Sequence, residues 1–175
     1  PFEGNALDMS GNGHHGITRG GVTLVQYGFS GNCYSFDGVN DRIELPSGLT
    51  SSLTKTVSVS FWIKTNTTSG SRFLFLRKGS GNNEAVKLGL NTNGVLEFRI
   101  NNNPLAADSP LTFGVWSQVT AVYNGSTKKI YLNGENIGSE AQSGSLPSSS
   151  SSSSYIGVDN DGGGSFNQFY KGNID

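Results

Sequence analysis

Charge and cysteine are both scarce in this sequence. Only 14% of the 175 residues are charged, and 12 Lys and Arg stand against 13 Asp and Glu. Nucleic acids and anionic membranes attract strongly basic proteins, so neither is an expected partner. No apolar run approaches the roughly 18 residues of a membrane-spanning helix, and direct membrane insertion is not expected. The single cysteine, Cys33, excludes an internal disulfide, and we expect it to be a small buried strand residue.

Helical periodicity is also missing, and alternation with a period of two residues takes its place. The best example, Thr56–Lys64, directs Val57, Val59, Phe61 and Ile63 to one side and Ser58, Ser60, Trp62 and Lys64 to the other. Val95–Ile100 alternates in the same way, and Lys128–Asn133 ends in an Asn133-Gly134 hairpin turn. Further strands are predicted at Val22–Tyr27, Cys33–Phe36, Arg42–Leu45, Arg72–Leu76, Val86–Leu90, Trp116–Tyr123, Tyr155–Val158 and Phe166–Tyr170.

Many short strands bounded by Gly, Asn, Ser and Pro predict an all-β protein built from two packed antiparallel sheets. The chain contains 25 Gly, and its composition does not change along its length, which favours a single domain over residues 1–175. A run of serines, Ser148–Ser154, is too polar to pack and predicts a surface connection.

Seven short motifs occur in an order that resembles the laminin-G-like, concanavalin-A-like jelly-roll family of bacterial surface proteins and glycan-active enzymes. They are Gly4–Asp8 with Ser10–Gly16, Phe36–Asp41, Val57–Lys64, Gly114–Trp116, Val122–Gly125, Ile130–Gly134 and Gly172–Asp175. The resemblance implies a two-sheet antiparallel jelly-roll sandwich in an extracellular or bacterial cell-surface protein. In that family a strand normally precedes Pro1 and another follows Asp175, so we expect a fragment of a longer multidomain protein, with its other domains as partners.

A calcium site is predicted in the Gly- and Asn-rich turn Asp8–Gly16, because calcium binds six to eight oxygens and such a loop can turn carbonyls inward. The resemblance implies Asp8, Asn12, carbonyls around residues 13–15, and Asp175 as ligands. The alternative is that Asp8 only caps a turn. A second, weaker metal site would use Asp159 and Asp161 beside Asn160. It lacks the Glu that closes an EF-hand loop, and a solvated turn is favoured there.

Aromatic and polar side chains on the faces opposite the core are candidates for ligand binding, because rings cover apolar sugar faces while polar groups bind hydroxyls. Trp62 is the first of these, although a covering loop could equally bury it. The other candidates are Tyr131, Glu97, Arg99 and, in a loop, Asn160.

Three functions follow from these features. The favoured one is a non-catalytic carbohydrate-binding or adhesion module, with a glycan or a surface protein as partner. The alternative is a structural or protein–protein spacer domain in a large adhesin or filament. A glycoside hydrolase is third, because no two Glu or Asp lie at alternate positions of one predicted strand as in jelly-roll glucanases.

Overall fold

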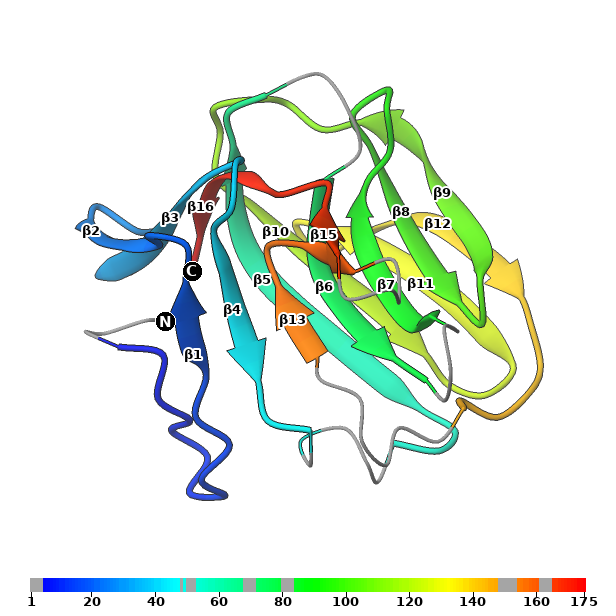
Figure 1. Ribbon diagram of the computed structural model, residues 1–175. Coiled ribbons are helices and arrows are strands. Elements are labelled where there is room, and N and C mark those ends of the chain that lie inside the picture. The colour runs from blue at the N-terminus through cyan, green and yellow to red at the C-terminus, as the bar shows by residue number, and fades with distance from the viewer. Residues whose placement is uncertain are drawn as a thin grey trace.

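The computed structural model describes residues 5–47, 49, 53–67, 72–79, 84–147, 154–160 and 165–175. These residues form two seven-stranded antiparallel sheets that face each other (Figure 1). The front sheet has the order β1 (Ile17–Arg19), β4 (Arg42–Leu45), β13 (Ser154–Ile156), β6 (Arg72–Lys78), β7 (Glu84–Leu90), β8 (Val95–Ile100) and β9 (Asn103–Pro110). The back sheet has the order β12 (Glu135–Ala141), β11 (Thr127–Leu132), β10 (Ser117–Tyr123), β5 (Val57–Thr65), β16 (Lys171–Ile174), β3 (Asn32–Asp37) and β2 (Thr23–Gln26). The predicted all-β jelly-roll sandwich is therefore confirmed.

The alternation seen in the sequence sets the two faces of each sheet. Along β8 every second residue is buried, so Leu96, Phe98 and Ile100 face the core while Glu97 and Arg99 face outward. Along β10 the residues Val119 and Ala121 are fully buried between the outward Gln118, Thr120 and Val122. Fully burying a Val, Leu, Ile or Phe side chain contributes about 1.5–3 kcal/mol to stability, so this pattern favours packing of the two layers.

Five strands that the sequence did not indicate complete the sheets and the small β14–β15 pair. The edge strand β9 contains Pro104 and polar residues, and proline is tolerated there because an edge residue needs no partner on its free side. The edge strand β12 and the short β1 are largely exposed and carry no alternation. The fourth is β14 (Asp159–Asn160), which pairs with β15 (Phe166–Asn167).

The fifth strand that the sequence did not indicate lies at the last of the seven motifs, Gly172–Asp175, whereas a strand was expected only after Asp175. Lys171–Ile174 is itself a strand, β16, and it pairs with both β5 and β3 inside the back sheet. The predicted Asn133-Gly134 turn is confirmed, because both residues have positive φ (50° and 85°) between β11 and β12.

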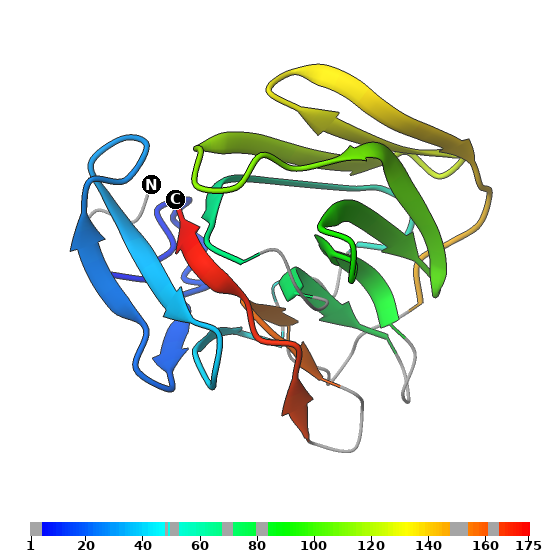
Figure 2. The same ribbon diagram turned by 90° about the horizontal axis from the view of Figure 1, so that it is seen from above.

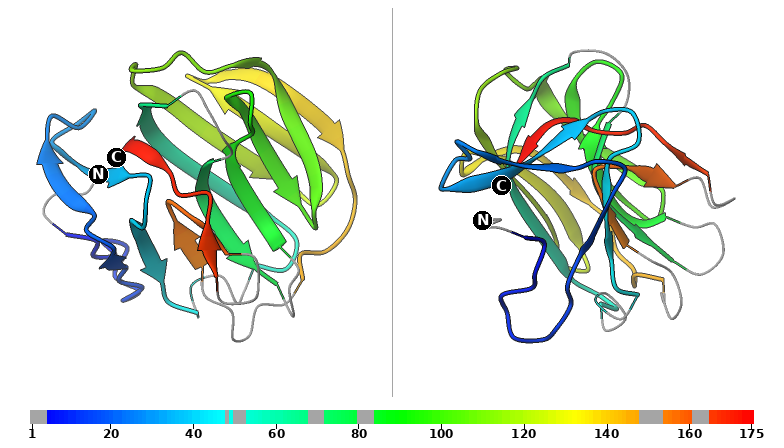
Figure 3. Two further views of the ribbon diagram at one scale, coloured as in Figure 1. Left: turned by 45° about the horizontal axis from the view of Figure 1, so that its top comes forward. Right: turned by 60° about the vertical axis from the view of Figure 1, so that its left-hand side comes forward.

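The outer faces of the two sheets differ in what covers them. The β14–β15 pair lies against the outside of the front sheet (Figures 1 and 2). There the Phe166 ring packs edge-on against Tyr155 and under the guanidinium of Arg42. At the β2 end of the back sheet, the β2–β3 hairpin stands to one side of the main body (Figure 3).

No helix that could cross a membrane occurs in the described ranges.

Candidate functional site

Two aromatic rings are stacked on the outer face of the back sheet. Trp62 lies on the outward side of β5, since its neighbours Phe61 and Ile63 pack toward the core. Phe29, in the loop between β2 and β3, covers it: the ring centroids are 3.4 Å apart and the planes differ by 6°. Phe29 is 50% exposed. Trp62 is thus an outward-facing ring that a loop residue covers on one side, and its role in ligand binding stays a prediction.

Asp175 holds this loop in place. Its backbone pairs with Trp62 in both directions, since each N–H donates to the carbonyl of the other residue at 2.9 Å. Its carboxylate accepts a hydrogen bond from the Ser30 N–H at 2.9 Å. A single residue therefore fixes the strand that carries Trp62 and the loop that carries Phe29.

Gly28 allows the loop to approach so closely. A Cβ atom at this position would lie 2.8 Å from Asp175 Oδ2 and 3.0 Å from the backbone carbonyl of Asn32. The N–H of Gly28 also donates to the carbonyl of Gly31 across the loop. The loop conformation that places Phe29 on Trp62 thus depends on the missing side chain.

An open hollow of about 360 Å³ lies beside the stacked rings. Its walls combine aromatic surface with hydroxyl and carboxylate groups, from Phe29, Ser30, Ser60, Phe61, Trp62 and Asp175. Aromatic area next to a few convergent polar groups is the composition of a small-molecule site. Because the hollow is open, a ring-shaped polar ligand could rest in it without any strand having to separate.

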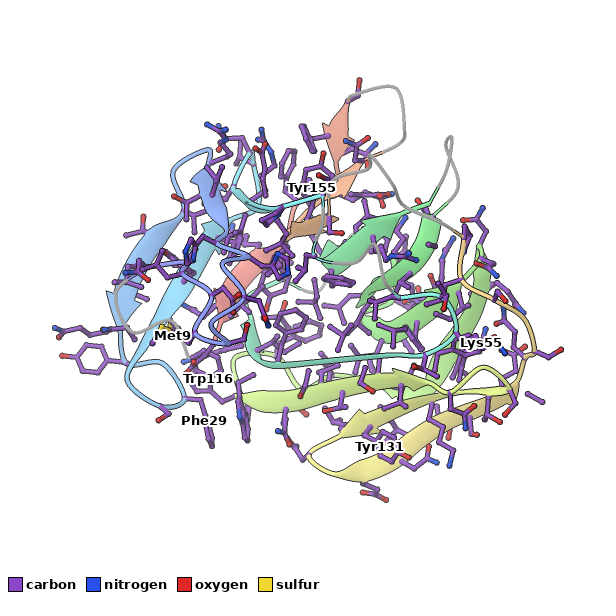
Figure 4. The ribbon with its side chains drawn as sticks, turned by 90° about the horizontal axis from the view of Figure 1, so that it is seen from below. Met9, Phe29, Lys55, Trp116, Tyr131 and Tyr155 are labelled. Carbon is purple, nitrogen blue, oxygen red and sulfur yellow. The ribbon has the colours of Figure 1, made fainter. Side chains whose placement is uncertain are left out.

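Polar side chains extend from the hollow across the outer face. Ser60 lies opposite Thr120 on β10, and their hydroxyl groups are hydrogen-bonded at 2.8 Å. Thr120 in turn lies opposite Tyr131 on β11. Figure 4 shows Phe29 and Tyr131 directed away from the body of the molecule on the same side.

The remaining predicted ligand-binding residues lie on the opposite face of the molecule. Glu97 and Arg99 form an ion pair on the outside of the front sheet. Asn160, predicted to stand in an open loop, is buried in β14 with 8% exposure. The five candidates therefore do not form one site: Trp62 and Tyr131 share the back sheet, Glu97 and Arg99 lie on the front sheet, and Asn160 lies in the β14–β15 pair outside the front sheet.

Asp159 is not in a solvated turn, which corrects the sequence-based preference. Its carboxylate is 2.8 Å from the Lys87 ammonium group, which is also 2.8 Å from Glu84. The same ammonium group lies 3.9 Å from the centre of the Phe73 ring. All three charged groups are largely buried, so the cluster fastens the β14–β15 pair to the front sheet. Asp161, the other residue of the weaker predicted metal site, lies outside the described residues.

At the predicted calcium turn, the Asp8 carboxylate caps the backbone. One oxygen accepts from the Ser10 N–H at 2.8 Å and the other from the His14 N–H at 2.9 Å. Hydrogen bonds to the charged form lower the pKa of Asp8 to about 2: the Ser10 side chain contributes most, followed by the backbone N–H groups of Ser10 and His14. Asn12 donates its amide to the Ser10 hydroxyl.

The two carboxylates of the predicted calcium site make separate contacts, Asp8 within its own turn and Asp175 with the β2–β3 loop. No group of three His, Cys, Asp or Glu side chains suited to a metal ion occurs within the described part of the chain. A calcium ion at Asp8 would need backbone carbonyls and water for most of its ligands. The calcium site stays a prediction.

Sequence reasoning missed Phe29 and Ser30 in the loop, and Ser60 and Phe61 on β5, as residues that line the hollow. The signal available was an aromatic residue inside a turn of small residues, Gly28-Phe29-Ser30-Gly31, where a buried role is not expected. Cys33 matches its prediction as a fully buried strand residue, and burial raises the pKa of its thiol.

Solved structures with the same fold include several binding domains. Domain 4 of AbnA, a GH43 extracellular arabinanase from Geobacillus stearothermophilus, in complex with arabinotriose, has a TM-score of 0.74 and 21% identity, over 98% of this chain and 84% of that one. The binding domain of Paraclostridial Mosquitocidal Protein 1 has a TM-score of 0.68 and 18% identity over 96% of this chain, but only 45% of its own length is covered. A putative carbohydrate binding protein from Bacteroides ovatus has a TM-score of 0.63 and 15% identity, over 82% of this chain and 41% of that one.

These likenesses concern the fold, because all three identities are below 25%. No curated protein sequence matches the chain. A family model does match, over residues 37–175, which include every strand from β4 to β16 and the greater part of both sheets. The chain belongs to the Laminin_G_3 family of the concanavalin A-like lectin/glucanases superfamily.

Proposed function

We propose that the chain is a non-catalytic carbohydrate-binding or adhesion module of an extracellular or cell-surface protein, and that sugar rings bind in the hollow beside Phe29 and Trp62. The observation that carries this proposal is the stacked aromatic pair, half-exposed Phe29 on partly buried Trp62, next to Ser30, Ser60 and Asp175. The apolar C–H face of a sugar packs on an aromatic ring, while its hydroxyl groups need the donors and acceptors that the same hollow provides.

Two of the structures of the same fold support a glycan as the ligand. The arabinanase domain is in complex with arabinotriose, and the protein from Bacteroides ovatus is described as a putative carbohydrate binding protein. The arabinanase is also called extracellular, which agrees with the location proposed for this chain. Because the sequence identities to these structures are only 21% and 15%, the proposal that this chain binds sugar is argued from its own residues.

The arrangement of acids supports a binding role over hydrolysis. Hydrolysis requires two carboxyl groups about 5–9.5 Å apart on either side of the bond to be cut. Asp175 is the acid among the described residues that line the hollow, and its carboxylate positions the Ser30 N–H. Glu84 and Asp159 do lie near each other, but both are largely buried and paired with Lys87.

A glycan array tests the proposal. The wild-type chain should bind a defined subset of glycans saturably, and Phe29→Ala should weaken that binding because it removes the exposed ring of the stack. Val39→Ala is a matched control, since Val39 is an exposed apolar loop residue (68%) that does not line the hollow. An array without saturable binding by the folded wild-type chain would contradict the proposal.

A further inference from the structure

Two parallel rows of outward side chains cross the back sheet next to the hollow. The first row consists of Ser60, Thr120, Tyr131 and Asn136, which lie opposite one another on β5, β10, β11 and β12. The second consists of Trp62 and Gln118, which lie opposite each other on β5 and β10, together with Asp175, whose backbone pairs with Trp62. Hydroxyl and amide groups therefore fill the space between two aromatic positions.

The spacing of these positions follows from the geometry of a sheet. Tyr131 is two strands away from Ser60, which corresponds to about 10 Å across the sheet. Trp62 is two residues from Ser60 along β5, about 7 Å in the perpendicular direction, which puts Trp62 and Tyr131 about 12 Å apart along the diagonal. A single sugar ring resting on the Phe29–Trp62 stack cannot also reach Tyr131. A chain of linked sugars lying across β5, β10 and β11 can reach both.

We propose that the site binds the interior of an oligosaccharide chain laid across β5, β10 and β11, with Tyr131 as a second aromatic contact. This inference rests on the proposed function and adds the shape of the ligand. A pocket closed at one end would select the terminus of a glycan, whereas this hollow is open and continues into the rows described above. Neutral groups dominate the path, since Ser60, Thr120, Gln118 and Asn136 carry no charge.

Exposure of the path agrees with this assignment. Ser60 and Asn136 are exposed, and Thr120, Gln118 and Tyr131 are partly exposed. The hydrogen bond between Ser60 and Thr120 pre-orients two hydroxyl groups, because each hydroxyl can donate one bond and accept others. A ligand can thus be hydrogen-bonded midway between the two aromatic positions without prior rearrangement.

A chain-length series tests the inference. The wild-type chain, Tyr131→Ala, Trp62→Ala and the control Lys129→Ala should be titrated with neutral oligosaccharides, from the monosaccharide to the hexasaccharide. The oligosaccharides are those of the glycan that binds most tightly on the array. Arabino-oligosaccharides are titrated in addition, whatever the array result. Lys129 is the control because it lies two residues from Tyr131, on the same strand and face but one row away. Melting temperatures establish that each variant is folded.

We expect wild-type affinity to rise with chain length and to level off once both aromatic positions are occupied. Tyr131→Ala should lower the affinity for the long members about 3- to 10-fold, the value of one aromatic contact, and leave the shortest binding member unchanged. Trp62→Ala should weaken every member, and Lys129→Ala none. A wild-type affinity independent of chain length, or a Tyr131→Ala variant equal to wild type on long chains, overturns this inference alone. An array and a series without any saturable binding overturn the proposed function as well.

Discussion

Replacing Gly28 with alanine should displace Phe29 from Trp62, because the added methyl group has no room. Its carbon would lie 2.8 Å from Asp175 Oδ2 and 3.0 Å from the carbonyl carbon and oxygen of Asn32, whereas ordinary contacts begin at 3.4 Å. The Asn32 atoms belong to the backbone of β3, and the Asp175 carboxylate is short and bonded to the Ser30 N–H. The Asn32 backbone cannot shift without disturbing β3, and the Asp175 carboxylate cannot shift without weakening its hydrogen bond to Ser30. The loop itself must therefore move by about half an ångström or more.

The cost has two parts. Forcing a methyl group into a packed position destabilises a protein by about 1–3 kcal/mol. A hydrogen bond to a charged group contributes about 1.5–3 kcal/mol when it is buried. Weakening the Ser30–Asp175 bond costs only a part of this, because Asp175 is partly exposed and solvent screens its charge. A loss of about 2 kcal/mol corresponds to a melting temperature lower by about 4–8 °C in a domain of this size.

Calorimetry of Gly28→Ala and Gly138→Ala measures this effect. Gly138 is the matched control, because a Cβ there would find its nearest neighbour, the Ala106 carbonyl oxygen, at an ordinary 3.4 Å. We expect the control to melt within about 2 °C of the wild type. Tryptophan fluorescence should change in Gly28→Ala as Phe29 leaves Trp62. Equal melting temperatures for both variants, with unchanged fluorescence, would refute the account of this loop.

Four further predictions concern charged groups. Lys87→Met should destabilise the fold by about 3–5 kcal/mol in urea denaturation, because Glu84 and Asp159 would stay buried without their cation, while Arg99→Met, whose side chain is 34% exposed, should cost less than about 1 kcal/mol; similar losses for both would contradict the cluster's role. Burial first, and then the charge of Asp37, raise the pKa of Asp41 above its usual 3.8, so its contribution to stability falls as the pH rises from 3.8 through the raised value. Asp41→Asn should therefore melt higher than the wild type at pH 7 and lose that pH dependence, and a variant that melts lower at every pH would refute this assignment. The pKa of Asp8 is lowered, so its capping contribution is present above pH 3.8 and disappears as the pH falls through about 2. The amide resonances of Ser10 and His14 should titrate with that midpoint in NMR spectra, and a midpoint near 3.8 would show that the cap does not form. If the predicted calcium ion binds at this turn, added calcium should shift the same two resonances and raise the melting temperature, and Asp8→Asn should abolish both effects.

The sequence predicts those parts of the structure that depend on local alternation. In β5, β8 and β10 every second residue is apolar, and each of these strands lies within one residue of its predicted range. The strand β9 was missed because an edge strand next to solvent needs no alternation and tolerates Pro104. Periodicity carries little information on a strand such as β9, in which only Leu105 and Ala107 are buried.

The site could be predicted only in part, because its contacts join distant parts of the chain. Trp62 was identifiable from its outward position, but Phe29 lies in a turn and meets Trp62 only when β2 and β3 fold beside β16. The bond between Asp175 and Ser30 spans 145 residues of sequence. Asp159 was assigned to a solvated turn for the same reason, since its partner Lys87 is 72 residues away.

The central claim is that sugar binds at the Trp62 ring, and calorimetric titration of Trp62→Ala against Tyr155→Ala tests it most directly. Both variants remove a partly buried aromatic side chain that is packed against one other ring, but Tyr155 belongs to the front sheet. With the glycan that binds the wild type most tightly, Trp62→Ala should lose at least about 10-fold in affinity, and Tyr155→Ala should bind as the wild type does. Unchanged affinity in a folded Trp62→Ala variant, or an equal loss in both, would contradict the claim.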